Sequence, residues 1–500
     1  MARLIGAFDS YSAWWAWVTV SLKRKEQKAS WADHYSALKA YYLNNGLYEV
    51  LESLLGPVGA NNVEARPLRN PAYRVVEFYA SKLWPGALPD ALPIVTDNAA
   101  LAPAIEQLWQ WSNWGSEKQV TARWFAMFGD MFIKVSSKAP EAGQPAKVYM
   151  SNLEPVYVTE MDTDERGYLT YIRIDIPRQR RAGDELKAYT HTEVWDKQQY
   201  RLYEHDKDGN TPISHLGRPT ISMPLAAMGI DFIPIVWQPF RNVGDERGMS
   251  AFGPAIDKID EANRQATRLH QMLFRNNRAL WAVTANGIDA QGRPLPPPRL
   301  GTDTAGDSLE LDDDTILRLP GQSDIKALVP SLNYADALAI LNAQLEEVSR
   351  DLPELAYFDL RSKDLSGVAI EMLLGDAIDR AVEARGNGET GMIRAHQMAL
   401  TIGKAQGLWA EVGSYEAGDY EHKFLERPII QASDLDNANL VAAWAKAGVN
   451  VRTALKRVGW DDDDLAKMDA DNKIEQTNQA NFADAVLTQA QTNFDQGVTQ

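Results

Sequence analysis

The sequence predicts an α+β fold in which one strand-rich region stands between helical regions. Apolar and polar residues alternate from Ala146 to Trp237, as in antiparallel strands with one buried face. Helical spacing of apolar residues covers about Ala255 to Ala279, a length of about 37 Å. A second long helix is expected from about Tyr334 to Leu352. Between the two helices, a Pro- and Gly-rich segment with short apolar runs predicts a small β-rich insertion.

Composition sets the broad class of the protein. The chain has 500 residues and 45% hydrophobic content, enough for a sizeable core and more than one domain. It has no cysteine, which excludes disulfides and thiolate metal sites and fits a reducing compartment. The longest apolar run near the start, Ser12 to Leu22, is about half the length of a bilayer crossing, so neither export nor membrane insertion is expected.

The charge balance limits the possible contacts with nucleic acid. The formal net charge is −17 at pH 7, and the isoelectric point is near 5.0. Proteins that grip DNA tightly present a basic face instead. The composition therefore fits a protein that works near nucleic acid without holding it.

Two helices are expected before the strand region. One amphipathic helix is predicted from Asp33 to Leu55, where it meets Gly56 and Pro57. The other lies within Leu68 to Gly86, with Asn70 as a cap and Pro71 in the first turn.

The second half of the chain reads as long helices joined by short connections. The β-rich insertion holds two predicted strands, 279–283 and 316–320. After it, the helix up to Leu352 carries apolar residues spaced 3 and 4 apart, as in a coiled-coil seam. They are Leu338, Leu341, Leu345, Val348 and Leu352.

A charged connection follows this helix. It spans Pro353 to Leu365 and separates two apolar-periodic segments. A third long helix is expected from the N-cap Ser366 toward Gly386, and a further one over Met392 to Trp409. Near the C-terminus, Asp434 caps one predicted helix and Val451 to Val458 forms another, before a Gln/Asn-rich end from about Ala480.

No catalytic residue, metal site or cofactor is predicted. The stretch Gly386 to Gly391 has dinucleotide-motif spacing but follows a helix, so it reads as a break between two helices. Asp162 to Gly167 lacks the later ligands of a calcium loop and reads as a hairpin turn. The acidic runs at 310–315 and 461–464 read as solvated faces, and the seven histidines show no metal-ligand spacing. There is also no phosphate-binding loop and no nucleophile elbow.

An enzyme remains the alternative. Fifteen tryptophans in an acidic, soluble chain could belong to a carbohydrate-active enzyme, which needs stacking platforms and a pair of carboxylates. Such enzymes usually use barrels or sandwiches, whereas this chain has one strand region and three long helices.

Three stretches, together with the order of elements, resemble tailed-bacteriophage portal proteins of the SPP1-like family. The first is "NPAYRVVEFYASKLWPG", the second is "DLSGVAIEMLLGDAIDRAVEARG", which is similar to the helix start after the portal tunnel loop, and the third is "LVAAWAKAGVNVRTALKRVGWDDDDLAKM", which is similar to the portal crown. The aromatic N-terminal segment with Trp14, Trp15 and Trp17 has no counterpart in that family.

The resemblance implies a portal-type ring subunit with named parts. Residues 1–29 would be an N-terminal arm, 30–248 and 366–429 the wing, 249–279 and 331–352 the stem helices, 280–330 the clip, 353–365 the tunnel loop, 430–478 the crown and 479–500 a flexible tail.

Site residues carried over from the resemblance fall in three groups. The tunnel loop in the DNA channel would use Pro353, Glu354, Asp359, Arg361, Lys363 and Asp364. The stem seam would use Leu338, Leu341, Leu345 and Val348, as part of a head-to-tail ring interface. The clip docking surface would use Arg293, Arg299, Glu310, Asp312, Asp313 and Asp314.

The implied assembly is a homo-oligomeric ring, usually a dodecamer, at the capsid vertex of the virion. It would form in the host bacterial cytoplasm, and double-stranded DNA would be packaged and ejected through it with weak, non-specific contacts. Its implied partners are the terminase large subunit, a head-completion adaptor, and the major capsid and scaffolding proteins, with no membrane contact. The packaging ATPase would be another protein.

Overall fold

The computed structural model describes two compact units. One comprises Met1–Phe358 and Asp376–Arg427, and the other comprises Asp359–Gly375 and Pro428–Gln500. The residues whose structure is described are 30–55, 66–84, 94–138, 140, 146–182, 185–207, 211–277, 280–285, 291, 293, 323–328, 334–360, 367–425, 427, 429, 434–458, 460 and 464–474.

The first helical region consists of two helices. α3 (Trp31–Leu43) begins with a capping box in which the Ser30 hydroxyl accepts from the backbone N–H of Asp33. It ends at Asn44 in the left-handed conformation (φ 51°), and α4 (Leu47–Leu55) follows. The prediction of one helix over Asp33–Leu55 is therefore wrong, because the chain divides into two helices at Asn44. Asparagine adopts the left-handed conformation readily, and this conformation ends the first helix. The predicted second helix is confirmed as α6 (Ala72–Lys82).

Two further helices were not expected from the sequence. α7 (Leu101–Trp111) and α8 (Trp114–Phe128) are separated by Asn113 in the left-handed conformation. Both carry core residues, and Trp109 and Trp114 are almost fully buried. α8 ends at Gly129 (φ 83°), where a Cβ atom would lie 2.5 Å from the backbone carbon of Met249.

The predicted strand region is confirmed as antiparallel, and it forms two sheets. One sheet has the order β3-β2-β9, from β2 (Asp130–Lys138), β3 (Lys147–Leu153) and β9 (Ile235–Pro239). The other has the order β4-β5-β6-β7-β8, from β4 (Val158–Thr163), β5 (Leu169–Ala182), β6 (Glu185–Asp196), β7 (Gln199–His205) and β8 (Ile221–Pro224). The predicted hairpin turn at Asp162–Gly167 joins β4 and β5.

Short elements complete the body. β1 (Ile94–Val95) pairs antiparallel with β12 (Lys423–Phe424). Single 3-10 turns occur at η1 (Pro155–Tyr157), η2 (Ile213–His215), η3 (Leu225–Met228), η4 (Gly253–Ala255) and η5 (Ala410–Val412).

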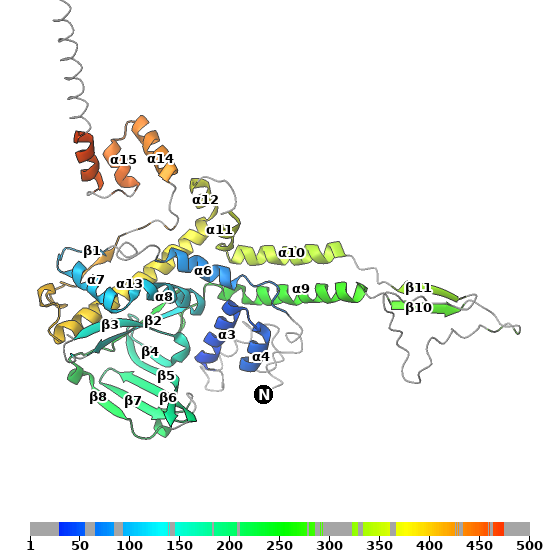
Figure 1. Cartoon of the computed structure of the whole chain (residues 1–500), viewed down its shortest axis with the longest axis horizontal. Coiled ribbons are helices and arrows are strands. Elements are labelled where there is room, and N and C mark those ends of the chain that lie inside the picture. The colour runs from blue at the N-terminus through cyan, green and yellow to red at the C-terminus, as the bar shows by residue number, and fades with distance from the viewer. Residues whose placement is uncertain are drawn as a thin grey trace, which may run out of the picture. The chain divides into compact units, whose positions relative to one another are not determined.

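Two long helices leave the body and lie side by side in opposite directions (Figure 1). They are α9 (Ile256–Asn277) and α10 (Tyr334–Asp351), and both agree with the predicted ranges. Between them, β10 (Leu280–Ala285) pairs antiparallel with β11 (Ser323–Leu328). The predicted first strand of the insertion is confirmed by β10, but its partner is β11, and the predicted strand at 316–320 lies outside the described residues.

α13 is one continuous helix from Gly375 to Ala405. The predicted break at Gly386–Gly391 is therefore wrong. A Cβ atom on Gly388 would lie 3.1 Å from the Trp84 ring, and one on Gly391 would lie 2.7 Å from Met131 Cε. These glycines allow close packing of α13 on its neighbours instead of ending the helix. Before it come α11 (Leu355–Leu360) and α12 (Gly367–Leu373).

The second unit contains the C-terminal helices. α14 (Asp434–Lys446) and α15 (Val451–Arg457) agree with the two predicted helices, and Asn450 caps α15 by accepting from the Arg452 N–H at 2.9 Å. A further helix covers 464–474. None of the described helices is both long and apolar enough to cross a lipid bilayer.

Candidate functional site

The connection after α10 begins with a buried carboxyl group. The Glu354 side chain is fully buried, and its Oε1 accepts from the Tyr79 hydroxyl at 2.5 Å. Arg380 Nη1 lies 3.7 Å from the same oxygen. Burial raises the pKa of Glu354, because an ionised carboxylate loses its hydration there. The expectation that Glu354 faces a channel is wrong for this chain, since the side chain fastens the end of α10 to α6.

The predicted loop from Pro353 to Leu365 contains a helix. The N–H of Leu355 donates to Leu352 O at 3.1 Å, and that of Ala356 donates to Pro353 O at 3.2 Å, which leads directly into α11. Pro353 is half-buried and Asp359 is exposed. Arg361, Lys363 and Asp364 lie outside the described residues, so their predicted role in the channel stays a prediction.

Part of the predicted stem seam packs within the chain. Leu341 is buried against Ala262 and Ala266 of α9, and Leu345 lies against the same cluster. Val348 is also buried, whereas Leu338 is 51% exposed. The heptad-like spacing therefore brings α10 onto α9 of the same chain, and only the outer part of α10 offers apolar side chains to another surface.

Exposed charges join α9 to the base of α10. Lys258 Nζ lies 2.7 Å from Asp351 Oδ2 and 3.5 Å from Glu347 Oε2. All three side chains are partly exposed, so solvent screens these ion pairs and they add little to stability. They connect the first turns of α9 with the last turns of α10.

A second buried carboxyl group fastens α9 to the N-terminal helices. Asp260 accepts from the hydroxyls of Tyr41 at 2.8 Å and Tyr48 at 2.9 Å. Burial raises the pKa of Asp260 to about 7, against the lowering effect of those two hydrogen bonds. The only hint in the sequence is an acidic residue on the apolar face of a predicted helix.

A third buried carboxyl group lies at the start of β2. Asp130 accepts from the Tyr35 hydroxyl at 2.7 Å, from the Trp237 indole N–H at 2.7 Å and from the backbone N–H of Gly248 at 2.9 Å. Burial raises the pKa of Asp130. α3, β9 and the loop before η4 therefore meet at one acidic side chain.

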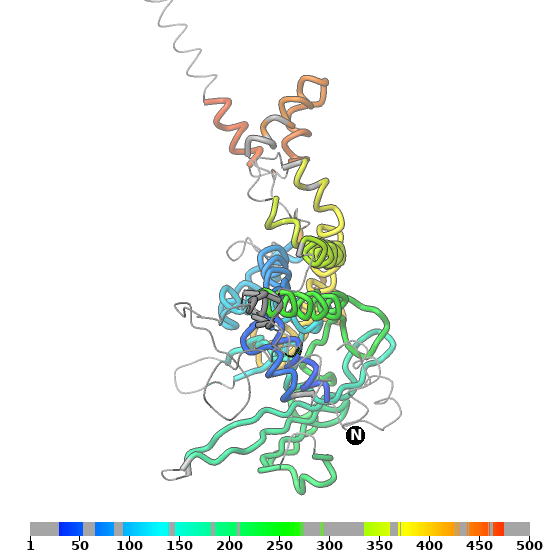
Figure 2. The backbone as a smooth tube through the Cα atoms, turned by 90° about the vertical axis from the view of Figure 1, so that its right-hand side faces the viewer, coloured from blue at the N-terminus to red at the C-terminus, as the bar shows by residue number. Residues whose placement is uncertain are grey.

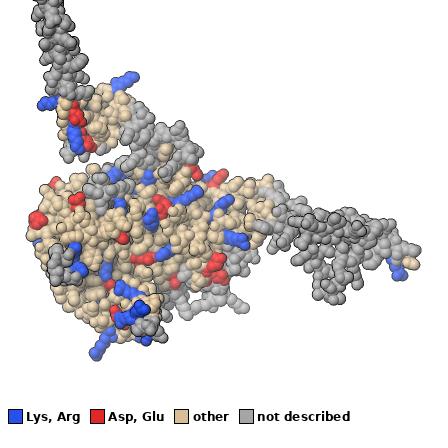
Figure 3. All heavy atoms as spheres, in the orientation of Figure 1, with Lys and Arg blue, Asp and Glu red and all other residues tan. Residues whose placement is uncertain are grey.

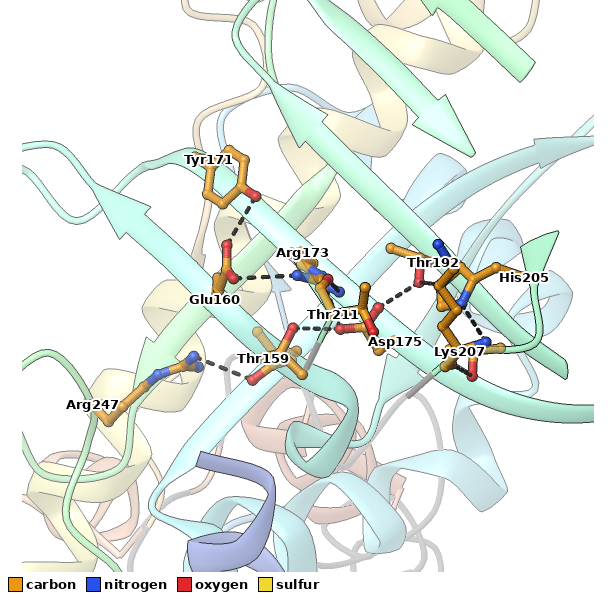
Figure 4. A network of polar contacts seen from close by, with 12 residues as sticks. Thr159, Glu160, Tyr171, Arg173, Asp175, Thr192, His205, Lys207, Thr211 and Arg247 are labelled. Atoms are coloured by element: carbon orange, nitrogen blue, oxygen red, sulfur yellow. Dashed lines mark hydrogen bonds and ion pairs between the residues drawn. The ribbon is translucent and has the colours of Figure 1, made fainter. Parts of the chain in front are cut away.

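The five-stranded sheet encloses a buried ion pair (Figure 4). Arg173 Nε lies 2.9 Å from Asp175 Oδ2, and the two side chains are 1% and 3% exposed. Arg173 also contacts Glu160 at 3.3 Å and donates to Thr211 O at 2.8 Å. These partners surround the guanidinium on several sides, which offsets the cost of burying it.

The network continues across two strands from Asp175 to His205 (Figure 4). Thr192 donates to Asp175 Oδ1 at 2.5 Å, and its hydroxyl lies 2.8 Å from His205 Nε2. The backbone N–H of Lys207 donates to His205 Nδ1 at 3.2 Å, so Nε2 carries the proton and donates to Thr192. All three side chains are buried. The polar groups of Asp175, Thr192 and His205 therefore satisfy one another inside the sheet.

A histidine pair lies between α13 and the strand β12. The Trp109 indole N–H donates to His396 Nε2 at 2.9 Å, so His396 Nδ1 carries the proton and donates to His422 Nε2 at 3.1 Å. His422 Nδ1 in turn donates to Tyr420 O at 2.9 Å. Burial lowers the pKa of both histidines, that of His396 well below its usual value.

A cavity of about 520 Å³ lies between the β4–β5 turn, β9 and α13. The guanidinium groups of Arg394 and Arg166 lie 4.4 and 5.4 Å from the Tyr168 ring centroid. Asp231 and Glu416 also line the cavity, so charges of both signs face it. The described residues around it show no nucleophile and base at hydrogen-bond distance from one another.

The remaining predicted site residues lie mostly outside the described part of the chain. Of the six residues predicted for the clip docking surface, Arg293 is described, and it is exposed. Arg299, Glu310, Asp312, Asp313 and Asp314 fall outside, so the proposed docking surface stays a prediction. Within the described residues, no three His, Asp or Glu side chains come together as a metal site would require.

Three tryptophans of the first unit are core residues. Trp84, Trp109 and Trp114 are at most 2% exposed. A stacking platform for carbohydrate needs an open ring face, which these three cannot provide.

Comparison with solved structures finds chains from gene transfer agent particles. One is in the neck of a native particle computed with C12 symmetry, with 12% identity over 78% of this chain and 89% of that chain and a TM-score of 0.39. Another is in the neck of an empty particle computed with C6 symmetry, with 14% identity over 76% and 86% and a TM-score of 0.39. A third is in the virion of a native particle, with 16% identity over 77% and 86% and a TM-score of 0.33. No protein-family model and no curated protein matches the chain.

Proposed function

We propose that this chain is the subunit of a portal ring, usually a dodecamer, at the capsid vertex of a tailed phage. Double-stranded DNA enters through the ring during packaging and leaves through it during ejection. The proposal includes no catalytic step and no cofactor. The motor that consumes ATP is a separate terminase.

The paired arm of α9 and α10 carries the proposal. The two helices leave an α/β body side by side, and a β hairpin lies at their outer ends (Figure 1). α10 leads back to the buried carboxyl group of Glu354. A helix pair of this length costs ordering entropy and gains little core within one chain. It is useful where neighbouring copies pack arm against arm around an axis, as in a closed ring with heterologous interfaces.

The remaining parts take roles that follow from the resemblance. The hairpin β10–β11 and its flanking clip residues dock the terminase large subunit and later a head-completion adaptor. The sheets and α13 form the wing, which contacts the capsid and scaffolding proteins. The unit that contains α14 and α15 forms the crown. The segment beyond α11, with Arg361 and Lys363, meets DNA weakly in the channel.

The mass of the purified chain in solution tests the proposal. Light scattering and negative-stain images of one sample should show a ring with a central hole, whose mass is a multiple of 55.7 kDa. A sample that remains monomeric when the protein is concentrated and when its capsid and scaffolding proteins are co-expressed would contradict it. Sugar-dependent quenching of tryptophan fluorescence in such a monomer would favour the carbohydrate-active enzyme instead.

A double substitution tests the channel role. Arg361→Ala with Lys363→Ala should leave ring formation intact and lower the amount of DNA packaged in a terminase-driven assay. The physical reason is the loss of the two cations of the loop that can touch phosphates. Normal packaging by rings of this variant would remove the channel role from these residues.

A further inference from the structure

β5 and β6 extend beyond the rest of their sheet. β4 pairs with β5 only as far as Ile174, and β7 pairs with β6 only as far as Thr190. Beyond these points, Arg178–Ala182 pair solely with Glu185–Tyr189, in a two-stranded segment that we call the ribbon. Figure 2 shows it extending away from the body. A two-stranded ribbon is only marginally stable by itself, so its persistence outside the sheet needs a reason.

The ribbon is positively charged in an acidic chain. From 178 to 189 the sequence has four cations against two carboxylates, Asp184 and Glu185, while the whole chain has a net charge of −17. The four cations are all exposed and are Arg178, Arg180, Arg181 and Lys187. Figure 3 shows Lys and Arg side chains gathered over this part of the five-stranded sheet.

The cations are placed unfavourably for the chain alone. Arg180 lies directly opposite Lys187, and like charges at opposed positions of a sheet are destabilising. The charge of Arg180 is balanced by an ion pair with Glu204, and its guanidinium lies 4.9 Å from the centroid of the Tyr189 ring. Arg178, Arg181 and Lys187 form no ion pair with any residue that the structure describes. Three exposed cations are therefore available to a partner.

A second copy of this chain is the partner that these charges fit. Two copies with a net charge of −17 each repel one another, and local surfaces of positive charge reduce this repulsion where the copies touch. The same chain presents exposed carboxylates, for example Asp376, Asp379 and Glu383 in a row on α13. Arginine suits such contacts, because its planar guanidinium binds a carboxylate through two hydrogen bonds.

We propose that the ribbon of one copy docks on exposed carboxylates of the neighbouring copy and helps to close the ring. The inference rests on the proposed ring function and adds an element of the interface to it. Each copy gives its ribbon to one neighbour and receives that of the other, as a heterologous interface requires.

Charge reversal tests the proposal. The variant Arg178→Glu, Arg181→Glu and Lys187→Glu keeps charges on the ribbon edges, so it protects them from aggregation as the original residues do. The matched control is Arg66→Glu, Arg69→Glu and Arg74→Glu, which changes the total charge equally at exposed residues outside the sheet. We expect the protein concentration needed for half-assembly to rise at least about tenfold in the ribbon variant and to change little in the control.

The possible outcomes separate the two proposals. If the original protein forms no ring even when it is concentrated and co-expressed with its capsid and scaffolding proteins, the portal proposal and the ribbon proposal both fail. If the original protein and the ribbon variant form rings equally well, only the ribbon proposal fails. An equal loss in the control would also overturn it, since total charge would then govern assembly. Unchanged assembly with a loss of DNA retention on filters would assign the ribbon to nucleic acid instead of a second copy.

Cross-linking identifies the partner surface directly. Because the chain has no cysteine, Gln179→Cys gives a single thiol on the exposed ribbon for a benzophenone maleimide. Mixing isotopically labelled and unlabelled chains should then give adducts between copies, with acceptor peptides rich in Asp and Glu. Adducts only within one copy would overturn the proposal.

Discussion

At the scale of single residues, three buried carboxyl groups have the same kind of hydrogen-bond partner. They are Asp130, Asp260 and Glu354. Each accepts a hydrogen bond from the hydroxyl of a tyrosine on an N-terminal helix. Each has a pKa raised by burial. Because a buried unpaired carboxyl is costly, each contact fixes one helix at one position.

Asp260 makes stability depend on pH near neutrality. Its folded pKa of about 7 is above the usual 3.8, so the folded chain holds a proton that the unfolded chain releases. This contribution to the free energy of unfolding is fully present below pH 3.8 and is lost as the pH rises toward 7. Its size is at most on the order of 4 kcal/mol. Asp260→Asn should flatten the dependence of the melting temperature on pH between 5 and 8. Asp379→Asn, at an exposed position on α13, is the control and should keep the original slope, whereas equal slopes in all three proteins would contradict the assignment.

The histidine pair gives the opposite dependence. His396 and His422 are neutral when folded and have lowered pKa values, so their contribution is full above about pH 6.5 and is lost as the pH falls below it. Protonation would place a charge beside the Trp109 N–H or the neighbouring ring. Hydrogen exchange, corrected for its intrinsic pH dependence, should show β12 losing protection between pH 7 and 5.5 while β2 keeps it. Unchanged protection of β12 at pH 5.5 would contradict this.

At the scale of elements, two glycines of α13 allow the effect of side-chain packing to be measured separately from the effect of helix propensity. A Cβ atom on Gly391 would lie 2.7 Å from Met131 Cε and 3.1 Å from Gln238 Cβ, while one on Gly386 would meet nothing within 4 Å. Gly391→Ala should therefore lower the free energy of unfolding by about 1–3 kcal/mol, through overpacking. Gly386→Ala should raise it by about 0.5–1 kcal/mol, because alanine favours the helix. Urea unfolding of both variants checks the signs, and a gain from both would show that α13 packs more loosely than described.

The same glycines show what local sequence patterns can predict. Apolar periodicity gave α6, α9 and α10 close to their bounds, because one face of each meets the core or a neighbouring helix. It failed at Gly386–Gly391, where the reason for glycine is a distant side chain, and at Asn44, where one left-handed residue divides a periodic run. The charged residues of the predicted loop did not reveal that Glu354 is buried, since its partner Tyr79 is 275 residues away in the sequence.

At the scale of the whole molecule, the acidic balance determines how DNA should behave. Each chain has a net charge of −17, so the proposed ring would repel phosphates within a Debye length of about 10 Å at 0.1 M salt. In the proposed channel, a few cations would guide DNA without binding it tightly, so translocation would not have to break a strong complex at each step.

This balance predicts weak DNA retention with a shallow salt dependence. Purified rings should hold linear double-stranded DNA on filters poorly at 50 mM salt, and raising the salt to 200 mM should change retention little, since few phosphates are neutralised. A protein making 6–10 phosphate contacts would instead lose about 10³–10⁵ in affinity over that range. Tight binding at low salt with such a steep loss would mean that a basic surface dominates over the net charge. The charge-reversed ribbon variant would then show whether that surface is the β5–β6 ribbon or the channel.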